Sequence, residues 1–327
     1  MRKPSPTLIS EAARLFSCPD DPEYYAGGHD WSDGTIYHHQ QQNLMLKFME
    51  AHDDQSLTGT KLRMAFARYL SDNGIPCLCP IPSINDDLVE VLDDDGHCYL
   101  CYAWQKLEGH TLADLHPQVL SSFYTNWGTM LGKCHKLATE YPLWHESMNP
   151  EGQVLSRKRE KEILGSMNPD PDVRQAWFEI HAKLDERSFD RSTHGFIHND
   201  PHPHNIIQSG SRLSLLDFDV SGLHFFATDV AICIYSEYSR ACFHSKHQVP
   251  RTDLRELFLR PFMKAYRSEY KLPESEIMDI ELFINYRRMI MYTVFYGQIS
   301  EQNPRYLQQF KREILEETPY LGFALDF

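Results

Sequence analysis

Apolar and polar residues follow two different periods along this chain, and the change of period divides it. In the first third, short apolar runs bounded by Gly, Pro, Asn and Asp predict strands at 43–49, 87–92 and 97–103. Beyond residue 112, apolar residues recur mostly every three or four positions, which is typical of helices with one buried face. The pattern therefore predicts a small amino-terminal part built on a sheet and a larger, mainly helical remainder.

Helical spacing predicts helices in both parts. The segments are 4–16, 58–71, 123–139, 172–186, 254–270, 274–296 and 304–316. A further helix is expected to open at Thr228–Ile232, with Asp229 near its positive end. The stretch 151–171 is polar and is predicted only as a connection to the helix that follows it.

Composition limits the class of protein. With 327 residues the chain exceeds the usual size of one hydrophobic core, which favours two lobes. No apolar run approaches the ~20 residues that cross a bilayer, and the basic start lacks a signal-peptide core, so we expect a cytoplasmic protein without a membrane partner. The formal charge of −14 argues against a nucleic-acid partner and is compatible with a small cationic substrate. The eight cysteines are expected to be free thiols in a reducing compartment.

The densest polar chemistry lies between residues 198 and 219. His-x-Asp is followed five residues later by Asn, and an apolar run then ends in Asp-Phe-Asp. Asp and Asn are common in turns, but this coupled spacing is typical of a phosphoryl-transfer site. We expect Asp200 to accept the proton of the attacking hydroxyl, and Asn205 and Asp217 to bind Mg²⁺ through oxygen atoms.

A histidine cluster allows another interpretation of the same segment. Its members are His194, His198, Asp200, His202 and His204. Imidazole and carboxylate groups bind zinc, but a hydrolytic zinc site would need further ligands, and no second cluster stands out. A zinc site would also leave the Asn and the Asp-Phe-Asp segment without a role, so magnesium is favoured.

Two features upstream are candidates for contacts to nucleotide phosphates. Lys47 lies within the apolar strand 43–49, where an ammonium group is costly unless it meets an anion; the alternative is an edge-strand Lys that reaches water. The glycine-containing turn before it carries Gly28, Ser32 and Gly34, whose backbone N–H groups could cover phosphates, although such a turn is also an ordinary hairpin.

The strand at 97–103 leaves the predicted sheet and enters the helical region, which makes residues 104–107 a natural hinge. Trp104 and Lys106 are candidates here, because the hinge backbone could pair with an adenine edge. The expected organisation is an amino-terminal lobe over 1–103, the hinge, and a helical lobe over 108–327 that holds the catalytic and metal-binding loops.

With these residues in view, the chain resembles the aminoglycoside phosphotransferase and choline kinase-like family of small-molecule kinases, most of all the bacterial subgroup that contains amicoumacin kinase. The segments that carry the resemblance are the turn at 27–34, Lys47, NGIPCLCPIPS, LEGHTL, WGTMLGKCHKLATEYP, HNDPHPHNII and LLDFDVSGLHFFATDVAICIY. The resemblance implies an α+β, two-lobed protein-kinase-like fold that uses ATP and Mg²⁺. By matching position it implies the same roles for Lys47, Asp200, Asn205 and Asp217, and a bracing role for Asp229.

The chain departs from the family pattern at two places. Asn199 stands where the family usually has Gly, a change that Asn tolerates because it adopts unusual backbone angles. The helix after the Lys strand normally supplies a Glu partner for Lys47, yet residues 55–71 contain no acidic residue. We expect another partner for Lys47, such as Asp219 or a residue of the glycine turn.

The function that follows is transfer of the ATP γ-phosphoryl group to a hydroxyl of a small, amine-bearing molecule. Candidate acceptors are antibiotics such as amicoumacins or aminoglycosides, amino alcohols and homoserine-like metabolites. Two alternatives remain: a protein Ser/Thr kinase of the stress-response type, and a degenerate nucleotide-binding protein. Aromatic and acidic residues of the helical part could contact the acceptor or equally belong to the core; they are Tyr235, Glu237, Tyr238, Tyr292 and Tyr296.

Overall fold

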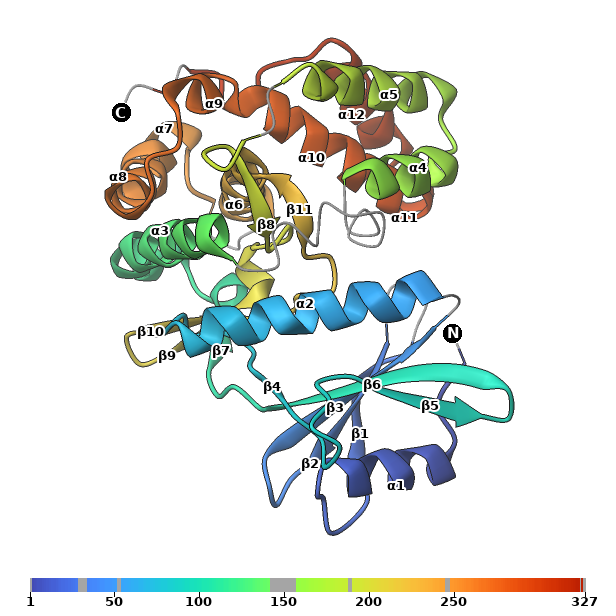
Figure 1. Cartoon of the computed structure of the whole chain (residues 1–327). Helices are drawn as coiled ribbons and strands as arrows, with labels where there is room; N and C mark the ends of the chain where they lie inside the picture. Colours follow the sequence, from blue (N-terminus) through green and yellow to red (C-terminus); the bar gives the residue numbers. More distant parts are fainter. Residues whose placement is uncertain are drawn as a thin grey trace. The chain divides into compact units, whose positions relative to one another are not determined.

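The computed structural model describes residues 2–28, 34–51, 54–141, 157–187, 190–244, 248–323 and 325. The chain forms two compact units, one of Met1–His110 with Ile207–Val220 and one of Thr111–Ile206 with Ser221–Phe327. The first unit contains an antiparallel sheet and the second is mainly helical (Figure 1). The predicted α+β class is therefore confirmed.

A sheet with strand order β1-β2-β3-β6-β4, to which β5 is added along β6, forms the centre of the first unit. Its strands are β1 (Glu23–Gly27), β2 (Thr35–His39), β3 (Leu44–Glu50), β4 (Pro80–Ile81), β5 (Glu90–Asp94) and β6 (His97–Gln105). All pairs are antiparallel. The strands predicted at 43–49 and 97–103 are confirmed, and the one predicted at 87–92 begins three residues later than expected.

Helix α1 (Pro6–Leu15) covers one face of this sheet (Figure 1). It begins at Ser5, whose side chain accepts a hydrogen bond from Leu8 N, and its apolar face packs on alternate residues of the strands. In β3 these are Leu44, Leu46 and Phe48. Because successive strand residues point to opposite faces, Lys47 lies on the other face, together with Tyr102 of β6, which pairs with it in register.

Residues 207–220 return to the first unit after the chain has passed through the second. They include most of the hairpin formed by β9 (Ile206–Ser209) and β10 (Arg212–Leu215). β7 (His110–Thr111) pairs with β9 as the third strand of this sheet. Leu215 exchanges backbone hydrogen bonds with Leu78 (2.7 Å) and Pro76 (2.9 Å). Phe218 is fully buried against Phe66 of α2 (Asp54–Asp72). The Asp-Phe-Asp segment is thus fixed to the sheet-containing unit by backbone bonds and one buried ring.

The second unit is built mainly from helices. They are α3 (Pro117–Glu140), α4 (Arg157–Met167), α5 (Pro171–Asp185), α6 (Phe226–Ser239), α7 (Arg251–Leu254), α8 (Arg260–Glu269), α9 (Glu274–Met278), α10 (Ile280–Val294), α11 (Tyr296–Gln302) and α12 (Pro304–Leu315). Gly128 and Gly132 let α3 approach α8 closely. A Cβ at Gly128 would lie only 2.1 Å from Phe262 O, and a Cβ at Gly132 only 2.6 Å from Tyr266 O. This contact fixes α3 against the rest of the unit.

Most predicted helices are confirmed, although α2 begins four residues and α3 six residues earlier than expected, and three further segments differ. The stretch 151–171, predicted as a connection, contains α4, whose mostly polar sequence gives a weak apolar period. The helix predicted at 254–270 is interrupted by a π-helical turn, η7 (Arg255–Leu259). The helix predicted at 274–296 divides into α9 and α10 at Asp279.

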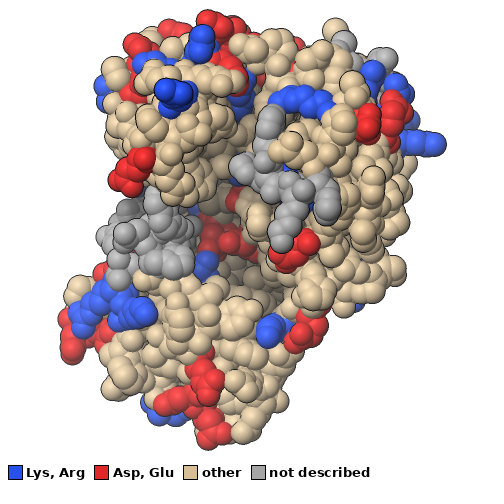
Figure 2. All heavy atoms as spheres, turned by 180° about the vertical axis from the view of Figure 1, so that it is seen from behind, with Lys and Arg blue, Asp and Glu red and all other residues tan. Residues whose placement is uncertain are grey.

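The surface and the cysteines add two observations. On the face seen in Figure 2, acidic and basic side chains lie close to one another in several places. None of the eight cysteines, all of which lie in described segments, forms a disulfide bond, and Cys101 is buried in β6 while Cys98 points to the opposite face of the strand. Among the described helices, none combines the length and apolar character that crossing a bilayer requires.

Candidate active site

The loop that carries Asp200 begins where β8 (His194–Ile197) ends, and β8 is paired with β11 (Gly222–Phe225). Asp229, buried in the first turn of α6, accepts hydrogen bonds from the backbone N–H groups of His198 (Oδ2, 3.1 Å) and Asn199 (Oδ1, 2.7 Å). Asn199 has a φ of 65°, a left-handed conformation that Asn adopts more easily than most residues. The hydrogen bonds by which Asp229 was expected to brace the loop are therefore present. Asn199 adopts the left-handed backbone conformation that Asn was expected to tolerate.

Asp229 is itself held by His135 of α3. His135 Nε2 lies 3.2 Å from Asp229 Oδ2, and its Nδ1 lies 2.8 Å from the Tyr266 hydroxyl. The imidazole is buried and stacks on Phe226. His135 is a satisfied core histidine, as predicted, and it connects α3 to the backbone of the loop through one carboxylate.

The Asp200 carboxylate is bracketed by two cationic or polar side chains of the same unit. Oδ1 lies 2.6 Å from Nη2 of Arg287 on α10, and Oδ2 lies 3.2 Å from Nε2 of His202. Burial by itself would raise the pKa of Asp200, but Arg287 and then His202 lower it well below its usual range. Since the side chain remains 23 % exposed, Asp200 is an ionised carboxylate that solvent can reach.

Asn205 lies beside Asp200 in the short 3-10 turn η5 (Pro203–Asn205). Its amide nitrogen donates to Asp200 O (3.0 Å) and, at 3.4 Å, approaches Asp200 Oδ2. The NH₂ group of the Asn205 amide therefore donates within the loop. The amide oxygen, which is the atom that a hard cation prefers, can still bind a ligand.

Glu160 of α4 is a site residue that the sequence analysis missed. Its Oε2 accepts from the side chain of Asn199 (3.2 Å), and its Oε1 accepts from the Tyr286 hydroxyl (2.8 Å). Burial raises the pKa of Glu160, and these two hydrogen bonds offset part of that effect. No local signal marks Glu160, since its partners are far away in the sequence and the surrounding segment is uniformly polar.

In the first unit, the candidates Lys47 and Asp217 lie near one another around Asp219. Lys47 Nζ forms an ion pair with Asp219 Oδ2, and the Tyr102 hydroxyl donates to Asp219 Oδ1 (2.7 Å). Asp219 N in turn donates to Asp217 Oδ1 (3.3 Å). Lys47 and Asp219 are buried, whereas Asp217 is exposed and has a φ of 56°. Lys47 is thus paired with Asp219, one of the partners that the sequence led us to expect.

The glycine turn also borders on Lys47. Gly28 N donates to Gly34 O (2.9 Å), which closes the base of the turn. A Cβ at Gly34 would lie 2.5 Å from Phe48 O and 3.0 Å from Lys47 Cε, so the backbone here runs directly over the Lys strand. Ser32 falls outside the described residues. A nucleotide role for this turn stays a prediction.

The predicted hinge residues Trp104 and Lys106 lie at the end of β6 and just after it. Trp104 is buried, with its ring centroid 5.6 Å from that of Tyr102. The backbone N–H of Lys106 already donates to Asn43 O (2.8 Å), and Lys106 Nζ lies 5.3 Å above the Tyr25 ring. That N–H is therefore engaged within the sheet, and an adenine contact at the hinge stays a prediction.

The zinc and magnesium alternatives depend on different side chains. In the part of the chain that the structure describes, no three His, Cys, Asp or Glu side chains come together in a metal-binding group. His194 is buried against Phe225 and bonded to Thr193, so it does not join the histidines of the loop. Asn205 of the second unit and Asp217 of the first each carry an oxygen of the kind that Mg²⁺ binds, and a magnesium site formed by both stays a prediction.

The aromatic residues considered for acceptor binding belong mostly to the core. Tyr235, Tyr238 and Tyr292 are buried, and Tyr292 donates to Asp170 (3.0 Å). Glu237 is fully buried between Tyr124 and Arg240. Tyr296 is half-buried, with its ring 5.6 Å from that of Tyr292.

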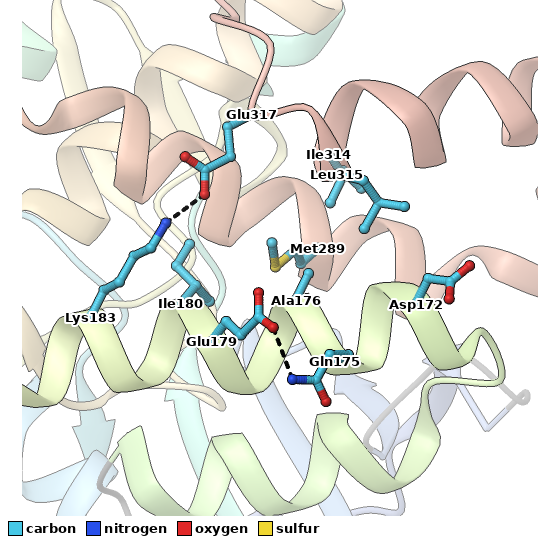
Figure 3. A pocket seen from close by; sticks show the side chains of 10 residues that line it. All are labelled: Asp172, Gln175, Ala176, Glu179, Ile180, Lys183, Met289, Ile314, Leu315 and Glu317. Carbon is cyan, nitrogen blue, oxygen red and sulfur yellow. Dashed lines mark hydrogen bonds and ion pairs between the residues drawn. The ribbon is translucent and has the colours of Figure 1, made fainter.

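A cavity of about 250 Å³ lies elsewhere in the helical unit, between α5, α10 and the end of α12 (Figure 3). Lys183 and Glu317, which line it, form an ion pair (2.6 Å), and Met289 of α10 also lines it. Met289 follows Arg287 by two residues on α10 and therefore points away from the side that contacts Asp200. This cavity is thus separate from the Asp200 carboxylate and its partners.

The chain is similar to known phosphotransferases. Residues 28–267 match the model of the phosphotransferase enzyme family. The chain is 25 % identical to amicoumacin kinase of Bacillus subtilis (strain 168) over 328 residues, covering 97 % of this chain and 93 % of that protein. Among solved structures, the amicoumacin kinase hAmiN in complex with AMP-PNP, Ca²⁺ and Ami has a TM-score of 0.77 at 22 % identity, covering 96 % of this chain and 93 % of the other.

A microcompartment-associated aminopropanol kinase has a TM-score of 0.63 at 14 % identity, covering 97 % and 100 % of the two chains. At these identities the structural likeness shows the fold, whereas the family match spans well over half of the sequence. That match includes the Lys strand, the Asp200 loop and the Asp-Phe-Asp segment. The chain therefore belongs to the phosphotransferase enzyme family.

Proposed function

We propose that this phosphotransferase transfers the γ-phosphoryl group of ATP to a hydroxyl group of a small molecule. The observation that carries the proposal is the Asp200 carboxylate, which is ionised, partly exposed and held by a braced loop. A carboxylate of this kind aligns an acceptor hydroxyl and receives its proton, which contributes typically 10²–10⁴-fold to the rate.

The remaining site residues take roles around the donor nucleotide. Asn205 and Asp217 would hold Mg²⁺ through their side-chain oxygens, and Lys47 would bind the phosphates that are not transferred. When bound, the ion neutralises the charge that develops on the phosphates. A relative with the same fold has been solved with AMP-PNP and Ca²⁺, which supports a nucleotide and a divalent cation as ligands. ATP as donor is consistent with a cytoplasmic location.

The acceptor class we favour is a small hydroxylated molecule that bears an amine. The relatives are named amicoumacin kinase and aminopropanol kinase, and the formal charge of −14 favours a cation over an anion as the incoming ligand. Amicoumacin, aminoglycosides, amino alcohols and homoserine are therefore the first compounds to test. A protein substrate has no comparable support.

The test is a screen for ADP release by the purified full chain with Mg²⁺ and ATP, with Asp200→Asn as the matched control. Release that depends on one acceptor, and that falls at least 10²-fold in Asp200→Asn, is the expected result. A thermal-shift titration with AMP-PNP and Mg²⁺ runs in parallel. Stabilisation by nucleotide without turnover of any acceptor would instead indicate a nucleotide-binding protein, and wild-type turnover by Asp200→Asn would overturn the role of Asp200.

A further inference from the structure

Among the described residues, Arg287 makes the shortest contact to the Asp200 carboxylate, and none of the sequence motifs includes it. It lies in the middle of α10 and is only 9 % exposed. Its Nη2 donates to Asp200 Oδ1 at 2.6 Å, a short, charge-assisted contact. Its Nε is buried and has no hydrogen-bond partner within the residues that the structure describes.

This arrangement is a poor way to stabilise a fold. A buried ion pair contributes little net stability unless the remaining donors are also satisfied, and a well-packed apolar side chain often does better. Arg287 leaves one buried donor unsatisfied and directs its charge to a carboxylate that is still reached by solvent. The free-energy cost of burying this arginine is understandable if its guanidinium group serves the reaction.

The two oxygens of Asp200 are treated differently. Oδ1 accepts from Arg287 at 2.6 Å, whereas Oδ2 has only longer contacts, to His202 (3.2 Å) and Asn205 (3.4 Å). A lone carboxylate can rotate about its Cβ–Cγ bond with little resistance. The short contact at one oxygen therefore fixes the plane of the group and keeps the other oxygen as the weaker-bound, more available acceptor.

We propose that Arg287 is a positioning residue for phosphoryl transfer, which fixes Asp200 through Oδ1 so that Oδ2 meets the acceptor hydroxyl. This inference rests on the proposed function. In the step it serves, the acceptor O–H gives its proton to Asp200, and its oxygen forms a bond to the γ-phosphorus. The bond from that phosphorus to the β–γ bridging oxygen breaks, and its electron pair leaves with ADP. Arg287 keeps its protons and its charge throughout.

The next residue of the same helix provides a matched control. Arg288 is 2 % exposed and also pairs with a carboxylate, Glu313 (2.9 Å), and with Thr318 O (3.0 Å). It resembles Arg287 in type, burial and pairing, but it contacts the carboxy-terminal segment in place of Asp200. Replacing Arg288 therefore measures what losing a buried arginine of α10 costs the fold alone.

The experiment compares Arg287→Met, Arg287→Lys and Arg288→Met in steady-state ADP release, with MgATP and the acceptor that the screen identifies. We expect Arg287→Met to lower kcat about 10²-fold, because a small misplacement of a reacting group has that effect. The KM for ATP should stay within about threefold, since the lost interaction belongs to the transfer step. Arg287→Lys should recover part of the rate, and Arg288→Met should unfold at a lower temperature yet keep its kcat.

Two results would overturn the inference: a wild-type kcat in Arg287→Met, or an equal loss of kcat in Arg288→Met at a temperature where both are folded. If Arg287→Met does not fold, Arg287→Lys decides alone, and a wild-type kcat in that variant counts against the inference. If the wild-type protein turns over no acceptor, the proposed function fails, and a crystal structure of Arg287→Met still decides the positioning. A reoriented Asp200 carboxylate supports it, and an unmoved carboxylate refutes it.

Discussion

The helical unit should lose stability in mild acid because it buries neutral histidines. His181 and His194 are at most 3 % exposed, and burial, reinforced by the charge of Arg157, lowers the pKa of each to about 3. His224 is buried beside the same arginine, and its pKa lies well below its usual value. An imidazole with these values stays uncharged in the folded protein down to a low pH.

The sign follows from proton binding in the two states. The unfolded chain takes up protons below about pH 6.5, whereas the folded unit does not take them up at His181 or His194 until about pH 3, so stability falls as the pH drops through this window. At pH 5 the loss amounts to about 2 kcal/mol for each of these two histidines. That is a large share of the 5–15 kcal/mol that typically stabilises a protein.

Urea denaturation of wild type, His194→Gln and His110→Gln at pH 7.5 and pH 5.0 measures the effect. We expect the free energy of unfolding of His194→Gln to fall by about 2 kcal/mol less between the two pH values than that of wild type. His110 is exposed, and its replacement should leave the difference unchanged. An unchanged pH dependence in His194→Gln would refute the reasoning, because it would mean that this imidazole is protonated equally in both states.

Three further predictions concern the candidate site. Asn199→Val should unfold at a free energy about 1–2 kcal/mol lower than Asn199→Gly, because both variants lose the hydrogen bond to Glu160 but only the β-branched residue is strained at a φ of 65°; equal urea midpoints for the two would contradict this. Asp219→Ala should lower the free energy of unfolding, because it removes the buried carboxylate that pairs with Lys47 and accepts from Tyr102, and the double variant Lys47→Met/Asp219→Leu should regain part of that loss in the same assay. Glu160→Gln should lower kcat but not the KM for ATP, because the amide has a single oxygen to accept from Tyr286 and Asn199; unchanged kinetics would remove Glu160 from the site.

Some parts of the site were predictable from the sequence because their residues lie close together along the chain. Asp200 and Asn205 are five residues apart, and a single loop places them in contact. The apolar period of the strand at 43–49 required Lys47 to be buried and therefore paired, and its partner Asp219 was already among the candidates. The tolerance of Asn199 for a left-handed backbone was likewise a property of the residue itself.

What the sequence by itself determined is the class of fold, the strand that buries Lys47 and the short motifs that carry the carboxylates, since each depends on periodicity or spacing within a few residues. The tertiary structure alone decided that α4 forms, that residues 207–220 join the sheet-containing unit, and that Arg287 and Glu160 reach the Asp200 loop. Arg287 is 87 residues away from its partner, and Glu160 is 39 residues away from Asn199. Contacts over such separations depend on how helices pack on one another. The hydrophobic periodicity of a single segment does not indicate that packing.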